Sequence, residues 1–106
     1  MVNEILTAAA LPGRRSRFVS PPAGRYVVWQ DDIETDGPDG MPPSIFRHAV
    51  TLELYASKPD PAAEAALEEA MSVRGLHWSK QERYWIASEQ MYQTLYEFNY
   101  TEKRRT

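Results

Sequence analysis

The chain has 106 residues with 42% hydrophobic and 25% charged content, which predicts a single domain over residues 1–106. It has no cysteine, which excludes disulfides, thiolate zinc sites and cysteine nucleophiles, and its net charge of −3 predicts no general affinity for nucleic acid. It shows no secretory signal and no apolar run of the ~18 residues that a membrane span needs, so we expect a soluble protein, made and assembled inside a cell, with no membrane partner.

The N-terminal quarter predicts one short helix and a connection. Apolar side chains of residues 1–11 fall on one helical face, and Pro12 and Gly13 end the pattern. Residues 14–24 contain three arginines and two prolines, which predicts an exposed, irregular, basic connection.

Two strands and a long loop are expected next. Residues 26–30 are β-branched and aromatic, and residues 45–56 alternate between apolar and polar, which predicts two strands. Between them, residues 31–43 are rich in acids, glycine and proline. We therefore predict a β-hairpin with an extended acidic tip.

The second half predicts a helix followed by two strands. Asp60 suits an N-cap and Gly75 a left-handed C-terminal position, so a helix is expected over about residues 61–74. Aromatic and β-branched residues predict strands over residues 76–87 and 91–102. The order α–β–β–α–β–β predicts an α+β fold, with a mostly antiparallel four-stranded sheet and helices packed on one face.

The acidic stretch has the beginning of a calcium-binding loop. Asp32, Glu34, Asp36 and Gly37 follow the opening pattern of an EF-hand. However, the twelfth position of such a loop needs a bidentate glutamate, and this chain has Pro43 there, with strands rather than helices on both sides. A solvated acidic loop is the favoured interpretation, and a calcium-regulated binding domain remains an alternative.

Catalytic signals are weak. His48 lies on the apolar face of its predicted strand, where a satisfied core or interface histidine is the usual outcome, and His77 is expected to point outward. No metal-ligand spacing, nucleophile motif or phosphate-binding glycine loop is present. We therefore predict no catalytic residue, no metal ligand, no cofactor and no enzymatic activity.

Nucleic-acid binding is an alternative carried by aromatic and basic residues that alternate in the second half of the chain. An open sheet with such side chains can stack bases. The acidic balance of the chain argues against it. The residues concerned are Trp78, Lys80, Arg83, Tyr84 and Trp85.

Self-association has the strongest support from composition. Both faces of the predicted strand 91–102 carry apolar or aromatic residues, and few helical residues are available to cover them. Residues 31–40 carry five acids, while residues 14–17 and 103–105 are basic. A head-to-tail ring would bring these unlike charges together.

Three segments of the chain have a familiar order and sequence: YVVWQDDIETDGPDG, HAVTLELYASKPDPAAEAALEEAM and SKQERYWIASEQMYQTLYEFNYTEK. In these segments, which cover most of residues 26–103, the chain resembles the tail-completion (tail terminator) proteins of long-tailed bacteriophages and prophages. The resemblance rests on the order of the elements and on sequence similarity rather than on a catalytic motif.

The resemblance implies a small α+β domain that assembles as a hexameric ring in the tail or neck of the virion. Such a ring caps the head-proximal end of the tail tube, stops polymerisation and offers a surface to the head connector. Its partners would be further copies of the chain, the tail tube protein and neck proteins. DNA would pass through the lumen without sequence-specific binding. Head-closure and other neck proteins are similar in size, so another neck component is the alternative.

The interaction residues are expected in two groups. The acidic loop tip is predicted to reach a neighbouring subunit, the tube protein or the lumen, and the aromatic residues to form subunit contacts. Neutralising Asp32, Glu34, Asp36 and Asp39 is expected to impair assembly while the melting temperature stays nearly unchanged. The full predicted set is Asp31, Asp32, Glu34, Asp36, Asp39, Trp85, Tyr92, Tyr96 and Tyr100.

Overall fold

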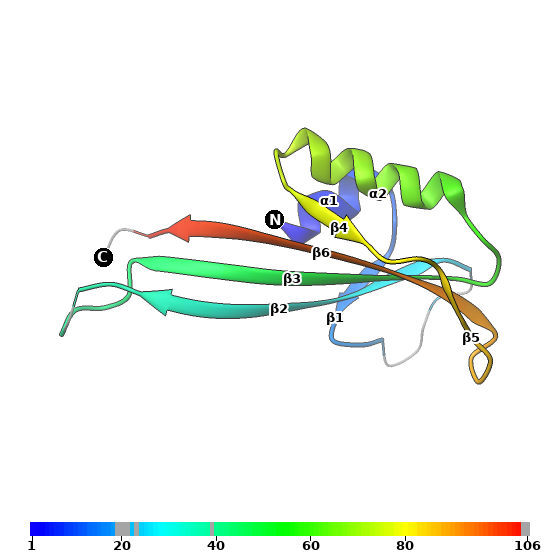
Figure 1. The fold of residues 1–106 in the computed structure, drawn as a ribbon, viewed down its shortest axis with the longest axis horizontal. Coiled ribbons are helices and arrows are strands. Elements are labelled where there is room, and N and C mark those ends of the chain that lie inside the picture. Colours follow the sequence, from blue (N-terminus) through cyan, green and yellow to red (C-terminus); the bar gives the residue numbers. More distant parts are fainter. Residues whose placement is uncertain (19–21, 23, 39, 105–106) are drawn as a thin grey trace.

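Three long strands form the centre of the fold. The computed structural model describes residues 1–18, 22, 24–38 and 40–104. In it, β2 (Tyr26–Asp36) and β6 (Met91–Lys103) each pair antiparallel with β3 (Ile45–Ala56), which lies between them (Figure 1). The register places Leu52 opposite both Trp29 and Tyr96, so the apolar positions of the three strands share one face.

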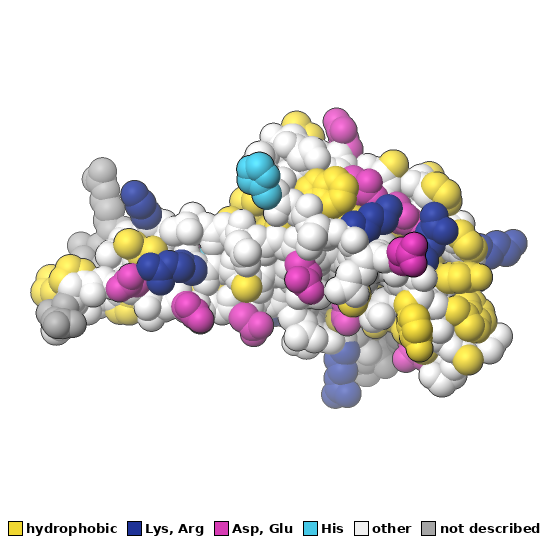
Figure 2. Space-filling model, in the orientation of Figure 1, with side chains coloured by type: hydrophobic (Ala, Val, Ile, Leu, Met, Phe, Trp, Pro, Cys, Tyr) yellow, Lys and Arg dark blue, Asp and Glu magenta, His cyan; other side chains and the backbone are white. Residues whose placement is uncertain are grey.

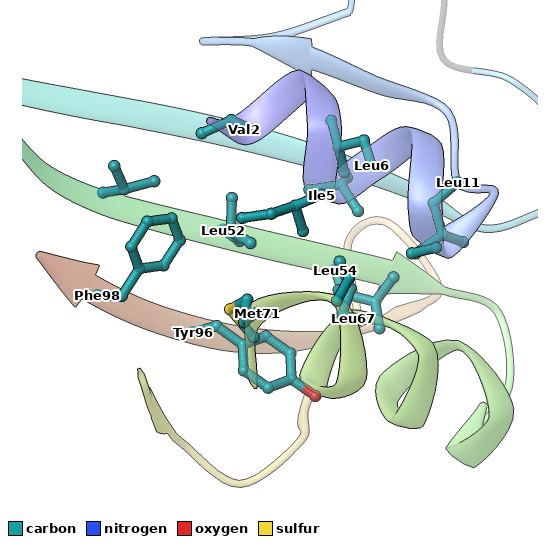
Figure 3. Close-up of a cluster of buried hydrophobic side chains, with 14 of the residues drawn as sticks. Val2, Ile5, Leu6, Leu11, Leu52, Leu54, Leu67, Met71, Tyr96 and Phe98 are labelled. Atoms are coloured by element: carbon teal, nitrogen blue, oxygen red, sulfur yellow. The ribbon is translucent and has the colours of Figure 1, made fainter. Parts of the chain in front are cut away.

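Two helices lie on that apolar face, which we call the helix face; the opposite side of the sheet is the open face. They are α1 (Val2–Ala9) and α2 (Pro61–Val73), as Figures 1 and 3 show. The predicted caps of α2 are confirmed, since the Asp60 side chain accepts from the Ala63 amide at 3.1 Å and Gly75 has a φ of 73°. Of the helices within the described residues, none is long and apolar enough to cross a membrane.

One apolar core fills the space between the helices and the sheet. Ile5 of α1, Leu67 and Met71 of α2, and Leu52 and Tyr96 of the sheet are all 0% exposed (Figure 3). Burial of each aliphatic side chain of this kind contributes roughly 1.5–3 kcal/mol. The amphipathic faces of both helices therefore hold them to the same side of the sheet.

The prediction of a four-stranded sheet with the order α–β–β–α–β–β is wrong. The described part of the chain forms a six-stranded sheet, with strand order β1-β2-β3-β6-β4 and with β5 also pairing with β6. β1 (Gly13–Arg15) was expected to be irregular, yet it pairs in parallel with β2 at Val27–Trp29. Buried Leu11 fixes the chain just before it, and Gly13 packs so closely on Leu6 that an added Cβ would lie 2.3 Å from Leu6 Cδ1.

The predicted strand over residues 76–87 is divided into β4 (Trp78–Lys80) and β5 (Tyr84–Ile86). Lys80 lies opposite Tyr96, whereas Tyr84 lies opposite Gln93. This edge therefore contains one more residue than the facing part of β6, as in a β-bulge. The extra residue reverses the alternation, so that Trp78 and Trp85 both lie on the helix face.

The predicted acidic loop over residues 31–43 is also corrected. β2 continues as far as Asp36, and residues 31–36 pair with residues 45–50 of β3. The hairpin connection is thus confined to residues 37–44, of which Asp39 lies outside the described residues. Cross-strand pairing with the strongly β-forming residues of β3 overrides the low strand propensity of the acids.

Candidate interaction surface on the projecting strands

The ends of the three long strands project beyond the helix layer. At about 3.3 Å per residue the 13-residue β6 spans roughly 43 Å, whereas the 13-residue α2 at about 1.5 Å per residue spans roughly 20 Å. The molecule is accordingly elongated, with extents of 50 × 29 × 22 Å (Figure 1). We call residues 32–36, 45–49 and 99–103 the arm.

Alternation along β2 distributes the predicted acidic residues over both faces. Asp31 lies on the helix face, whereas Asp32, Glu34 and Asp36 lie on the open face. Figure 2 shows acidic side chains spaced along the margin of the arm where β2 lies in Figure 1. The sequence therefore predicted an acidic surface, but not that one of its members turns inward.

Asp31 contributes to a buried polar cluster at the base of the arm. Its Oδ2 lies 2.7 Å from His48 Nδ1, and the two side chains are 9% and 6% exposed. His48 stacks on Tyr100 with ring centroids 4.2 Å apart, and its Nε2 lies 3.5 Å from Glu102 Oε1, too far for a good hydrogen bond. Burial, followed by the charge of Asp31, raises the pKa of Tyr100. Asp31 and His48 thus join β2 to β3 within one subunit.

The acids on the open face remain at the surface. Asp36 forms a 2.8 Å ion pair with Arg47, whose hydrogen bond, together with that of the Gly37 amide, lowers the pKa of Asp36. Asp32 and Glu34 are exposed and have no ion-pair partner within the part of the chain that the structure describes. These two carboxylates are therefore available for contact with another molecule.

Both edges of the arm are open. β1 covers the outer edge of β2 at Val27–Trp29, and β4 covers the outer edge of β6 opposite Trp78–Lys80. Within the described ranges, no strand pairs with the outer edge of β2 at residues 32–36 or with that of β6 at residues 99–103. Each of these edges presents backbone donors and acceptors to another chain.

The predicted aromatic contact residues do not form one surface. Tyr96 is 0% exposed and belongs to the core, where its hydroxyl donates to Glu68 at 2.7 Å. Tyr100 stacks on His48 within the arm. Trp85 is 41% exposed and packs on Tyr92 at 4.8 Å, at the opposite end of β6 from the arm. Of the four, Trp85 is the one that is exposed at the surface.

An ionic network around the buried carboxylate of Glu64 joins α2 to the edge of the sheet, and no sequence motif predicted it. Glu64 binds Lys80 at 2.7 Å and also accepts from Arg83. Lys80 bridges to Glu68 at 2.8 Å. Burial would raise the pKa of Glu64, but the hydrogen bonds from Lys80 and Arg83 outweigh it and lower that pKa. The partners are distant in sequence, which is why no motif links them.

This network weakens the nucleic-acid alternative. Lys80 and Arg83 already bind carboxylates of α2, and the Trp78 indole donates to Ser72 at 3.0 Å. Tyr84, at 67% exposure, and Trp85 remain as accessible aromatic rings. A phosphate-binding surface requires free cations beside the stacking rings, and here Lys80 and Arg83 are already paired with carboxylates.

The calcium alternative is weakened by the geometry of β2. Asp32, Glu34 and Asp36 follow one another on an extended strand, where alternate side chains stand roughly 6.6 Å apart. A calcium loop instead curves so that its oxygens converge at about 2.3–2.6 Å from one ion. Among the described residues, no group of three or more His, Asp or Glu side chains is placed to hold a metal ion.

No protein-family model matches the chain, and a search of curated proteins found no match.

Proposed function

We propose that this chain is a ring-forming structural protein of a long-tailed phage or prophage, which completes the tail by closing the head-proximal end of the tail tube. The observation that supports this best is the arm, a polar three-stranded extension with an open edge on each side. Monomeric proteins usually shorten, cover or bulge such edges, whereas an oligomer can use them for assembly.

In a ring made by repeating one contact, one face of the sheet lies on the outside and the other faces the central channel. Helices α1 and α2 add a second layer to the helix face, so a narrow ring accommodates them on its outside. The open face then lines the channel. The charged side chains of β2, β3 and β6 on that face are the acids Asp32, Glu34, Asp36, Glu53 and Glu97 and the bases Arg47 and Lys103.

Such a lining suits the passage of DNA. Its excess of carboxylates repels the phosphate backbone, so DNA moves through without adhering. The proposed partners are further copies of the chain, the tail tube protein on one side of the ring and a connector of the head on the other. The protein acts by assembly rather than by catalysis, and its place is the tail or neck of the virion.

Deletion of the gene from its phage or inducible prophage tests this function. If the ring ends tube growth, electron microscopy of the lysate should show tails longer than normal beside unattached heads. Supplying the intact gene in trans should restore tails of uniform length joined to heads.

The same images distinguish the alternative neck component. Loss of a head-closure protein leaves tails of normal length beside heads that have lost their DNA. Normal infectious virions after deletion would overturn any role in the neck. A shift of labelled DNA by the purified protein at low salt would instead favour the nucleic-acid module.

A further inference from the structure

The two open edges of the arm lie at the same level of the sheet. The register places residues 32–36 of β2 opposite residues 45–49 of β3, and these opposite residues 99–103 of β6. β2 and β6 both run antiparallel to β3, and therefore run in the same direction. A copy set head-to-tail beside another brings the open edge of β6 beside the open edge of β2 as a parallel pair, at levels of the sheet that β1 and β4 do not cover.

Backbone groups on the edge of β2 point toward such a neighbour. Trp29 O, on the outer edge, accepts from the Ser16 amide at 2.8 Å. Because the direction of the backbone groups alternates along a strand, those of Ile33 and Thr35 also point outward.

The corresponding groups of β6 follow from the same alternation. Leu95 O, on the side of β6 away from β3, accepts from the Gln81 amide at 3.0 Å. The N–H and C=O groups of Asn99, Thr101 and Lys103 therefore point outward from the sheet. In a parallel pair, the outward groups of one strand lie between the outward groups of the other. This condition is met when the neighbouring copy is not shifted along the strands, so that residue 99 of β6 lies opposite residue 32 of β2; we call this the unshifted register.

We propose that residues 99–103 of β6 pair in parallel with residues 32–36 of β2 of a second copy of this chain, so that one sheet continues from copy to copy. Donor side chains of β6 then face carboxylates of β2 on the open face. In the unshifted register the facing pairs are Asn99 with Asp32, Thr101 with Glu34, and Lys103 with Asp36.

The helix face of the same contact is also complementary. Ile33, which is 44% exposed, comes beside Tyr100 of the neighbour and loses its contact with water. Pairing of β2 with β2 of another copy would instead set the acids of residues 32–36 against each other, which is unfavourable. Charge thus favours the head-to-tail contact, which continues in one direction and can close into a ring.

The closure of these contacts into a ring rests on the proposed function. The contact between two copies does not, and it can be tested on the purified protein. Thr101→Pro removes one outward N–H, and proline is tolerated at such an edge position. Thr101→Ala is the matched control because it keeps that N–H. Light scattering across concentration should show oligomers for the wild type and Thr101→Ala, and monomers for Thr101→Pro, with unchanged circular dichroism.

Cross-linking tests the contact without relying on the proline variant. The chain has no cysteine, so Asp36→Cys and Lys103→Cys introduce single thiols, and neighbouring strands bring their Cα atoms within disulfide range. Mild oxidation of the two variants together should give several-fold more disulfide dimer than Asp36→Cys with Glu97→Cys. Glu97 has the same face and is exposed, but β4 covers its backbone edge.

Each result separates the contact from the function. Oligomers without preferential cross-linking would overturn this contact and leave the proposed ring intact. Preferential cross-linking together with normal tails after gene deletion would support the contact and overturn the function. Monomers at every concentration with no preferential cross-link would overturn the contact.

Discussion

His48 and Asp31 form a buried pair at the base of the arm, with Nδ1 of the histidine 2.7 Å from Oδ2 of the aspartate. The side chains come from neighbouring strands, and each is over nine-tenths buried. Asp31 Oδ1 and His48 Nε2 are buried without a hydrogen-bond partner among the described residues. The pair is therefore sensitive to the removal of either member, because few alternative partners surround it.

We expect Asp31→Ala to lower the free energy of unfolding by about 1–3 kcal/mol, because His48 Nδ1 would lose its buried partner. Glu34→Ala is the matched control, since it removes an exposed carboxylate of the same strand and should leave stability nearly unchanged. Urea unfolding followed by circular dichroism measures both variants.

Replacing both members of the pair provides the second arm of this test. Asp31→Leu with His48→Phe should recover much of the stability lost in Asp31→Ala, because no buried polar group is then left unpaired. Equal losses for Asp31→Ala and Glu34→Ala would show that the pair contributes no stability.

The exposed acids should affect assembly rather than folding. We expect Asp32→Asn with Glu34→Gln to leave the melting temperature nearly unchanged, because both side chains are exposed. The same change should reduce the average particle mass in light scattering, since it removes charge from the β2 edge of the proposed contact. Asp32→Glu, which keeps the negative charge, is the control and should assemble as the wild type does, and a fall in its particle mass would contradict the charge argument.

Periodicity and capping rules identified the elements that have strong local signals. Alternation located β3, aromatic and β-branched content located β6, and Asp60 and Gly75 located both ends of α2. These elements could be predicted because each signal depends on residues that are close in sequence. The α+β class followed from them.

Elements that depend on distant contacts were not predictable. β1 is a strand because Leu6 and Leu11 hold it beside β2, and the division between β4 and β5 accompanies the binding of Arg83 to Glu64. The strand character of residues 31–36 similarly comes from their pairing with β3. Because acidic residues have low strand propensity, the sequence did not predict that β2 continues through residues 31–36.

Acid should weaken the fold through Glu64. Its pKa is lowered from the ordinary value of 4.5, so on acidification the unfolded chain takes up a proton before the folded protein does. The contribution of Glu64 to stability is therefore complete above the ordinary value and is lost as the pH falls through the folded pKa. We expect Glu64→Gln to be less stable than the wild type at neutral pH and to lose less stability between about pH 5 and pH 3.

Glu69→Gln is the matched control for this pH dependence, because Glu69 is an exposed residue of the same helix. Denaturant unfolding at a series of pH values should give parallel curves for Glu69→Gln and the wild type. A Glu64→Gln curve that is also parallel to the wild type would show that the network with Lys80 and Arg83 does not couple folding to protonation.

Gly13 should be required for the contact between β1 and α1. An added Cβ would lie 2.3 Å from Leu6 Cδ1, and Leu6 is itself 5% exposed, so its side chain has little room to move away. We expect Gly13→Ala to cost about 1–3 kcal/mol of the free energy of unfolding through overpacking. Leu6→Ala opens space at the same place, so Gly13→Ala should cost much less in that background. A double-mutant cycle by urea unfolding measures the difference, and equal costs in both backgrounds would show that the effect of alanine comes from the backbone rather than from the contact with Leu6.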